Sequence, residues 1–283
     1  MIQGRCLCGT VRFEVGGPIA DMVHCHCSMC RKHHGTPYAT WAVAPAAGFR
    51  YTAGQDSVAR YESSPGMHRS FCSNCGSVMP ELHDGVGLAV IPAGNLEGDL
   101  GTEPRLHMFV ASKASWHEIT DDLPRHDGFP AEFGMQGVDR AAVATSGDGV
   151  HGSCLCGGVA WRITGAPLRM YYCHCSRCRL GRSAAHASNI FYQAEGFEWQ
   201  RGKSLVRDYK LPGAQFFGTA FCSCCGGAVP RISPERNFAL VPAGPLDDDP
   251  GIRAGAHIYA DSRAGWDRIT DGIPQFPEMP PRR

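Results

Sequence analysis

The chain has 283 residues, and its 27 lysines and arginines balance 27 aspartates and glutamates, so that the formal net charge is zero. A chain without a positive field has no long-range attraction for nucleic acid or an anionic membrane surface, so neither is expected as a partner. No stretch approaches about 18 consecutive apolar residues, and the sequence predicts neither a signal peptide nor a membrane span. We therefore expect a cytoplasmic protein, in which the 15 cysteines favour metal binding over disulfides.

A single pattern occurs twice along the chain. Gly4–Val15 (GRCLCGTVRFEV) matches Gly152–Ile163 (GSCLCGGVAWRI), and Phe71–Pro80 (FCSNCGSVMP) matches Phe221–Pro230 (FCSCCGGAVP). Each copy also contains Cys-His-Cys-Ser-x-Cys-Arg and ends in Trp-x-x-Ile-Thr-Asp-x-x-Pro. An internal repeat of this length indicates two copies of one structural unit.

The repeat predicts a first domain at residues 1–130 and a second at residues 150–283, each large enough for its own hydrophobic core. Residues 131–149 are rich in Gly, Ala, Ser and Asp and show no strand pattern, which is typical of a linker. The oligomeric state stays open.

Short apolar or alternating runs separated by Gly, Pro, Asn and Asp predict strands throughout the chain. In the first copy these runs are Val11–Val15, Tyr38–Val43, His68–Cys72, Leu88–Ile91 and His107–Val110, and the second copy repeats them. No long segment has a strong 3.6-residue period, and the best candidates for a short helix follow Cys30 and Cys178. We expect a mainly β fold with short strands and many turns.

Four cysteines of each copy form a Cys-x-Cys pair near the start and a Cys-x-x-Cys pair after the middle. They are Cys6, Cys8, Cys72 and Cys75 in the first copy and Cys154, Cys156, Cys222 and Cys225 in the second. Four thiolates complete a tetrahedral zinc shell and leave no position for a substrate, so each set is predicted to be a structural clamp. The additional Cys224 aligns with Asn74 and is predicted to be a spare thiol.

The remaining three cysteines of each copy form a different kind of set. Cys25 and Cys27 lie two residues apart in an extended segment, so both can face one metal, and a turn returns Cys30 to it. The same arrangement is repeated by Cys173, Cys175 and Cys178. Three protein ligands with an open fourth position are typical of a catalytic zinc.

Several histidines near these sets have alternative roles. His33 is a candidate fourth ligand, but the second copy has glycine at that place, and the alternative is a surface histidine. His26 and His174 are candidates for proton transfer beside the metal, with structural packing as the alternative. For His107 and His257, in apolar strands, a core position is a commoner outcome than a pocket role.

In their order, these motifs resemble the GFA family of glutathione-dependent formaldehyde-activating enzymes, which includes centromere-protein-V-like proteins. The resemblance covers nearly the whole chain outside the linker. It implies two tandem zinc-binding β-tent domains, in which the four-cysteine sites are structural and the three-cysteine sites catalytic. It also implies a carbon–sulfur lyase that acts on a glutathione-like thiol and a small aldehyde.

The residues after the three-cysteine motif differ between the copies. Arg31, Lys32 and Gly35 offer positive charge and backbone room for an anionic thiol such as glutathione in the first copy. In the second copy Leu180 and Ser183 replace the lysine and the glycine. We therefore expect the first half to be the better site for a glutathione-like thiol.

A mechanism follows from an open zinc position, in which an entering thiol would bind as thiolate. Addition of its sulfur to an aldehyde carbon would give an S-hydroxyalkyl adduct, and the reverse reaction is carbon–sulfur cleavage. The alternatives are a zinc-stabilised interaction module without chemistry and, more remotely, an iron–sulfur protein. A protein side chain in the fourth position would favour the module.

Overall fold

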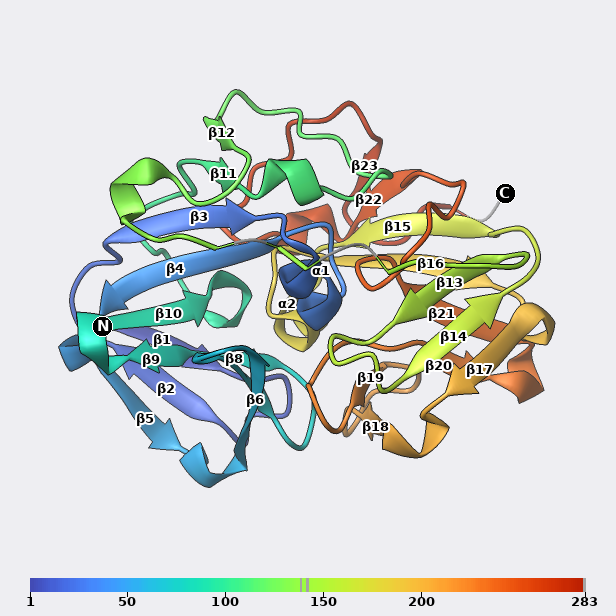
Figure 1. Ribbon diagram of the computed structural model, residues 1–283, viewed down its shortest axis with the longest axis horizontal. Coiled ribbons are helices and arrows are strands. Elements are labelled where there is room, and N and C mark those ends of the chain that lie inside the picture. The colour runs from blue at the N-terminus through green and yellow to red at the C-terminus, as the bar shows by residue number, and fades with distance from the viewer. Residues whose placement is uncertain (138, 141–142, 282–283) are drawn as a thin grey trace.

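The computed structural model describes residues 1–137, 139–140 and 143–281. In this part of the chain the regular structure is mainly β-strand, and the strands gather into two similar halves on either side of a central pair of short helices (Figure 1). The prediction of a mainly β fold in two similar halves is confirmed. The strands are short because Gly, Pro and polar turn residues interrupt the apolar runs.

The strands of the first half follow one another closely along the chain. They are β1 (Ile2–Arg5), β2 (Arg12–Val15), β3 (Asp21–Cys25), β4 (Ala39–Pro45), β5 (Phe49–Ala53), β6 (Val58–Ser64), β7 (Met67–Cys72), β8 (Val78–Met79), β9 (Glu81–His83), β10 (Leu88–Pro92), β11 (His107–Met108) and β12 (Arg125–His126). Those of the second half are β13 (Val150–Ser153), β14 (Ala160–Ile163), β15 (Arg169–Cys173), β16 (Ala187–Tyr192), β17 (Phe197–Arg201), β18 (Val206–Lys210), β19 (Gly218–Cys222), β20 (Arg231–Ser233), β21 (Phe238–Pro242), β22 (Ala256–Ile258) and β23 (Gln275–Phe276).

Each half is built on one six-stranded sheet. Its order is β12-β11-β3-β4-β10-β9 in the first half and, read in the same direction, β23-β22-β15-β16-β21-β20 in the second. Strand β3 pairs antiparallel with β4 and parallel with β11, which places Cys25 opposite Met108. A three-stranded sheet, β1-β2-β5 or β13-β14-β17, and a hairpin, β6-β7 or β18-β19, complete each half.

The helices α1 (Ser28–His34) and α2 (Ser176–Arg182) each begin directly after a cysteine. The Sγ atom of Cys27 accepts a hydrogen bond from the backbone N–H of Cys30 at 3.3 Å, and α2 repeats this contact. The thiol thus occupies the position of an N-terminal cap, where a side-chain acceptor satisfies a free N–H group. The helices were expected to follow Cys30 and Cys178 but instead contain them, because the preceding cysteine caps the helix.

The hydrophobic cores of the two halves are not independent, contrary to the expectation from domain size. Trp116 of the first half packs into a core of second-half side chains that includes Trp161. In return, Trp266 of the second half packs into the first-half core around Phe13. Large aromatic side chains dominate the energetics of the cores they enter. The closing Trp-x-x-Ile segment of each copy therefore stabilises the other copy.

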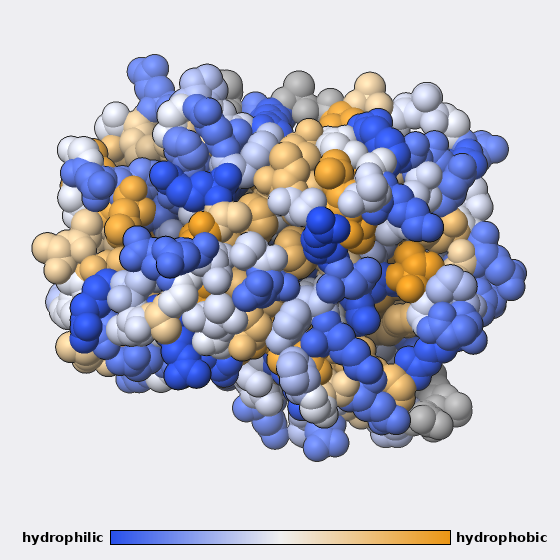
Figure 2. Space-filling view, turned by 90° about the horizontal axis from the view of Figure 1, so that it is seen from below, coloured by the Kyte–Doolittle hydropathy of each residue, from blue (hydrophilic) through white to orange (hydrophobic). Residues whose placement is uncertain are grey.

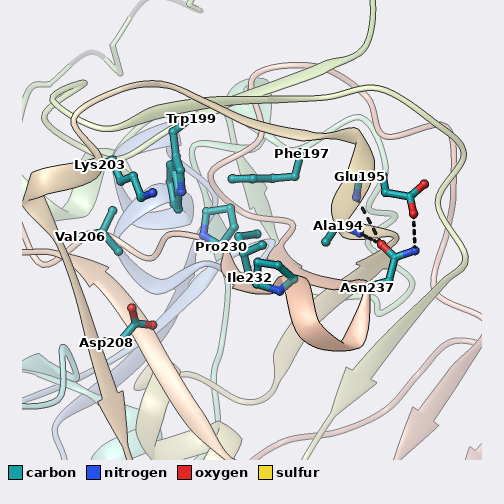
Figure 3. A pocket seen from close by; sticks show the side chains of 11 residues that line it. Ala194, Glu195, Phe197, Trp199, Lys203, Val206, Asp208, Pro230, Ile232 and Asn237 are labelled. Carbon is teal, nitrogen blue, oxygen red and sulfur yellow. Dashed lines mark hydrogen bonds between the residues drawn. The ribbon is translucent and has the colours of Figure 1, made fainter.

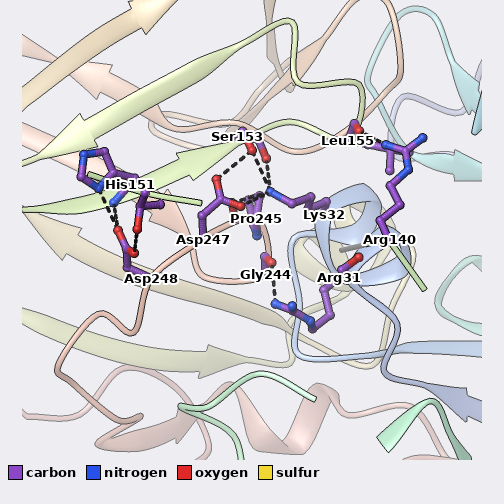
Figure 4. Close-up of polar contacts among 12 residues, drawn as sticks. Arg31, Lys32, Arg140, His151, Ser153, Leu155, Gly244, Pro245, Asp247 and Asp248 are labelled. Carbon is purple, nitrogen blue, oxygen red and sulfur yellow. Dashed lines mark hydrogen bonds and ion pairs between the residues drawn. The ribbon is translucent and has the colours of Figure 1, made fainter. Parts of the chain in front are cut away.

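Polar contacts join the halves around Lys32 (Figure 4). Its ammonium group donates to the carbonyl oxygen and the hydroxyl of Ser153 at 2.9 and 2.8 Å, and it lies 2.6 Å from Asp247 Oδ1. The Lys32 and Asp247 side chains are only 11% and 5% exposed, so water and salt screen the pair little. Burial lowers the pKa of Lys32, and the charge of Asp247 opposes that change. A buried ion pair therefore fastens α1 to the second half.

On the face shown in Figure 2, hydrophobic and hydrophilic residues are mixed in small groups, and neither kind forms one large patch. Among the described residues, none of the helices has the length and apolar character needed to cross a bilayer.

Replacing Lys32 by methionine should destabilise the whole chain, because Asp247 would stay buried without its cation. Removing one partner of a buried ion pair costs about 3–5 kcal/mol of unfolding free energy. The shared cores predict that both halves unfold in a single transition. Urea denaturation, followed by circular dichroism and by tryptophan fluorescence, measures both quantities.

The matched control is Lys203→Met, at an exposed lysine of the second half, which should change the unfolding free energy by less than about 0.5 kcal/mol. An unchanged midpoint in Lys32→Met, or two separate transitions in the parent chain, would show that the halves are not coupled in this way.

Candidate metal centres

Both predicted four-cysteine sets come together in the structure. Within each set the Sγ atoms all lie within 4.8 Å of one another, in Cys6, Cys8, Cys72 and Cys75 and in Cys154, Cys156, Cys222 and Cys225. A zinc–sulfur bond of about 2.3 Å places the sulfurs of a tetrahedron about 3.8 Å apart. The Sγ atoms of Cys8 and Cys72 are 3.8 Å apart, and so are those of Cys156 and Cys222. The spacing therefore fits tetrahedral zinc.

Local backbone geometry directs N–H groups at these sulfurs. The N–H of Val11 lies 3.3 Å from Cys6 Sγ, and that of Val159 lies 3.2 Å from Cys154 Sγ. Hydrogen bonds to the charged form of a group favour that form, so these contacts stabilise the thiolates that a metal needs. Cys224 is exposed and does not belong to the second set.

Both three-cysteine sets also come together. Their Sγ atoms lie within 4.8 Å of one another, in Cys25, Cys27 and Cys30 and in Cys173, Cys175 and Cys178. In the described ranges of the chain, no fourth His, Cys, Asp or Glu ligand atom joins either set. His33 is 2% exposed and lies outside the first set, so the alternative of a surface histidine is wrong.

Strand β3 explains which side chains reach the first three-cysteine set. Side chains alternate along a strand, so Cys25 and Val23 face one side while His24 and His26 face the other. The cysteine side is apolar, because the three cysteines pack with Val23 and Met108. The candidate metal position is therefore bounded by apolar side chains on the strand side.

A guanidinium group lies beside each three-cysteine set. Arg69 of β7 donates from Nη1 to Cys30 Sγ at 3.6 Å. Burial alone would lower the pKa of Arg69, but the thiolates of Cys30 and Cys27 outweigh it and raise that pKa. The second half has Thr219 at the position of Arg69, and there Arg182 of α2 lies near Cys178. Burial lowers the pKa of Arg182 to about 10 against the opposing effect of Cys178.

The predicted proton-transfer histidines lie in chains of hydrogen-bonded groups. His26 Nε2 lies 2.8 Å from His107 Nδ1, and His107 Nε2 lies 3.0 Å from both carboxylate oxygens of Asp121. The second half repeats the chain through His174, His257 and Asp271, with distances of 2.8, 3.0 and 3.1 Å. His26 is 0% exposed and faces away from the thiol side of β3. Its catalytic assignment, and that of His174, stays a prediction.

Several polar side chains missed by the sequence interpretation fill the space between these two chains. They include Tyr38 and His117 of the first half and Tyr172, His186 and Asp267 of the second. Burial lowers the pKa of His117 to about 3, and Tyr172 Oη lies 3.5 Å from its Nδ1. In the second half Asp267, which aligns with His117, lies 3.3 Å from His174 Nδ1. His117 and Asp267 directly follow the tryptophan of the repeated closing segment. The two copies have different residues at this position, so the repeat gave no sign of a shared role.

The residues expected to bind an anionic thiol have other partners in the structure. Lys32 is bonded to Ser153 and Asp247, and Arg31 donates from Nη1 to the carbonyl oxygen of Gly244 at 3.2 Å. Leu180, which aligns with Lys32, likewise packs across the interface, against the first four-cysteine set. Arg31, Lys32 and Gly35 therefore contact the other half, and the reason for preferring the first half as the thiol site does not hold. Thiol binding itself stays a prediction.

A surface hollow of about 600 Å³ lies in the second half, away from the cysteines (Figure 3). Phe197, Trp199 and Ile232 line it, together with Lys203 and Asp208 at its edge. None of the cysteines or buried histidines described above belongs to its lining. The hollow is therefore separate from the cysteine sets and the buried histidines.

Comparison with known proteins identifies the family. A family model described as glutathione-dependent formaldehyde-activating enzyme, GFA, matches residues 1–112 and 149–262. The chain belongs to the GFA family. The two matched segments contain all of the candidate metal ligands, so both halves carry the family pattern.

Individual relatives match one part of the GFA chain. A Halomonas elongata protein, provisionally named a glutathione-dependent formaldehyde-activating enzyme, is 32% identical over 135 residues, which are 42% of this chain and 81% of the relative. An uncharacterized lyase of Schizosaccharomyces pombe is 28% identical over 82 residues, which are 27% of this chain and only 54% of that protein. A Rhodobacter sphaeroides protein of known crystal structure is 27% identical in sequence, and the match covers 34% of this chain and 89% of that protein. The TM-score of 0.30 is too low to compare the two folds.

Purified without chelators, the chain should hold up to four zinc ions, one for each of its four cysteine sets. The four-cysteine sets should be the fullest, because they complete the metal shell with protein ligands alone. Elemental analysis against protein concentration measures the ratio. Iron with acid-labile sulfide, or disulfides between these cysteines, would contradict the assignment.

Loss of a ligand should have different consequences at the two kinds of set. Cys72→Ser or Cys222→Ser should lower the thermal midpoint strongly, because a structural zinc supplies folding free energy directly. Cys27→Ser or Cys175→Ser should lose metal at that set with a smaller change in the midpoint. Differential scanning calorimetry combined with metal analysis tests this, and equal destabilisation by both kinds of variant would count against two classes of site.

Proposed function

We propose that this GFA protein is a zinc-dependent carbon–sulfur lyase or adduct-forming enzyme that acts on a glutathione-like thiol and a small aldehyde. The support comes from the contrast between the two kinds of cysteine set. In both halves one set has the four sulfurs that close a zinc shell, and the other has three. A shell with one free position is typical of zinc that meets a substrate.

Zinc, when bound, supplies a position that holds the sulfur of the thiol as thiolate. The protein supplies the geometry of that position. Cys25 comes from the end of β3 and Cys30 from the first turn of α1, and Cys27 both joins the set and caps the helix. Reactants held in a fixed relative position react faster because much of the entropy cost of their encounter is removed.

Arg69 addresses an electrostatic difficulty of a three-thiolate site. Three thiolates donate much negative charge, which weakens the attraction of the metal for a fourth, anionic sulfur. The guanidinium of Arg69 donates to Cys30 Sγ and therefore withdraws part of that charge. Arg182 lies near Cys178 and has the corresponding charge in the second half.

The reaction forms a carbon–sulfur bond and an oxygen–hydrogen bond, and it breaks the carbonyl π bond and the bond between the proton and its donor. The thiolate sulfur adds to the aldehyde carbon, the carbonyl π pair moves to the oxygen, and that oxygen takes one proton to give the S-hydroxyalkyl adduct. The reverse sequence cleaves the carbon–sulfur bond. His26 and His174 stay candidates for supplying this proton, with water as the equal alternative because both histidines lie on the side opposite the thiols.

The histidine chains position the metal strands. His107 stands on β11, which pairs with β3 next to Cys25, and it links His26 to Asp121. A ligand strand that is held by buried, charged hydrogen bonds has little freedom to shift. The chain from Asp121 to His26 thus fixes the backbone that presents Cys25 and Cys27.

The alternative function is a zinc-stabilised interaction module without chemistry. A side chain that closed the three-cysteine sets would favour it, and among the described residues no such ligand joins them. Family membership alone cannot decide between the two functions, because one fold can host several activities.

The test uses zinc-loaded full-length protein with glutathione and ¹³C-formaldehyde, in which NMR exchange spectroscopy measures the rate of adduct formation and cleavage above the rate in buffer. The double variant Cys27→Ser/Cys175→Ser should reduce the protein-dependent rate by at least about tenfold, because both reacting sites lose a ligand. The matched control is Cys224→Ser, at an exposed cysteine outside the sets, which should retain the rate. No protein-dependent rate, or the same rate in the double variant, would favour the interaction module.

A further inference from the structure

The two three-cysteine sites differ in their access to solvent. The first set is closed, with Cys25, Cys27 and Cys30 only 3–4% exposed. In the second set Cys173 is 6% exposed, whereas Cys175 and Cys178 are half-buried. The first turn of the adjacent helix is also more buried at the first site than at the second. Met29 of α1 packs against the core, whereas the aligned Arg177 of α2 is exposed.

The residues that close the first site come from the segment between the two halves. Phe129 and Phe133 pack against the apolar cluster that contains the three cysteines. The ring of Phe129 lies 4.8 Å from that of Phe109, edge to face. The chain then folds back over this ring, because a Cβ atom on Gly137 would lie 2.9 Å from Phe129 Cε2. This connecting segment, residues 129–137 and 139–140, thus covers the first site.

Two adjacent side chains anchor the end of the connecting segment. The carboxylate of Asp139 accepts from the backbone N–H of Ser28 at 2.5 Å and from its hydroxyl at 2.7 Å, directly beside Cys27. Arg140 donates to the carbonyl oxygen of Leu155 at 2.6 Å and to that of Ser63 (Figure 4). The segment is therefore held on the first site by contacts with both halves.

At the second site Tyr259 and Phe276 pack against the apolar cluster that contains the cysteines. Met279, which aligns with Phe129, is 49% exposed. Ser176, which aligns with Ser28, is exposed. The second set therefore keeps an open side at Cys175 and Cys178.

We propose that the second three-cysteine site is the one that admits a thiol of peptide size, and that the connecting segment restricts the first site to small ligands. This proposal rests on the proposed function, in which the three-cysteine sets meet the thiol. It reverses the order expected from Arg31, Lys32 and Gly35, since those residues contact the other half. The repeat thus contains two similar metal sets with different substrate access.

The experiment compares a bulky and a small cysteine reagent on the zinc-loaded, full-length chain. Fluorescein maleimide, which is about as large as a peptidic thiol, and iodoacetamide are each reacted briefly, and peptide mass spectrometry quantifies the adducts at Cys27, Cys30, Cys175 and Cys178. The ratio of bulky to small labelling at each site corrects for differences in thiolate reactivity. We expect this ratio to be about tenfold higher at the second site, because labelling of a thiolate follows its exposure.

Variants of the connecting segment test the cause. Asp139→Ala and, independently, Arg140→Ala should raise the ratio at Cys27 and Cys30 several-fold and leave the ratio at Cys175 and Cys178 unchanged. The matched control is Asp148→Ala, an exposed aspartate outside this segment and just before β13, which should change neither ratio. Equal ratios at the two sites of the parent chain would overturn the proposal, as would an unchanged first-site ratio in both variants. Labelling does not depend on turnover, so a chain without lyase activity can still support or refute this inference.

Discussion

Thiol groups that lie within 4.8 Å of one another are the constraint on which the rest of the structure depends. Four buried thiolates repel one another, and the interior stabilises such a set only with a cation at its centre. In each half the set ties the turn after the first strand to a hairpin some 65 residues later, with Cys6 and Cys72 as examples. The remaining strands pack around the turn and the hairpin that these cysteines bring together.

Duplication of the unit changed which surfaces are buried. Because the two halves exchange Trp116 and Trp266, the centre of the molecule is an interface as well as a core. Positions that align in the repeat make different contacts across this interface. Lys32 forms an ion pair with Asp247, while the aligned Leu180 packs on a cysteine set. The replacement of Lys32 by leucine in the second copy therefore alters the interface between the halves and not the wall of a thiol pocket.

The same central position explains the unusual polarity of the interior. His26, His107 and their second-half counterparts are almost fully buried. His107 and His257 contact an aspartate directly, and they link His26 and His174 to it. Burial lowers the pKa of His107 and Asp121 opposes this effect. Buried polar groups are tolerated when their hydrogen bonds are satisfied. The hydrogen bonds of Nε2 in His26 and His174 therefore offset part of the cost of burying these imidazoles, whose Nδ1 atoms have no hydrogen-bond partner among the described residues.

The sequence by itself determined the repeat, the mainly β class and the grouping of cysteines into fours and threes, because these depend on local spacing and on the preferences of zinc for thiolate ligands. It also placed β2, β4, β7, β10 and β11 within a few residues, since short apolar runs and turn residues are local signals. Only the tertiary structure decided that the cores are shared, that Lys32 lies in an interface, and that Asp139 binds Ser28 beside the first three-cysteine set. These features join residues that are far apart along the chain. Their pairing depends on how the two halves pack, which no local pattern records.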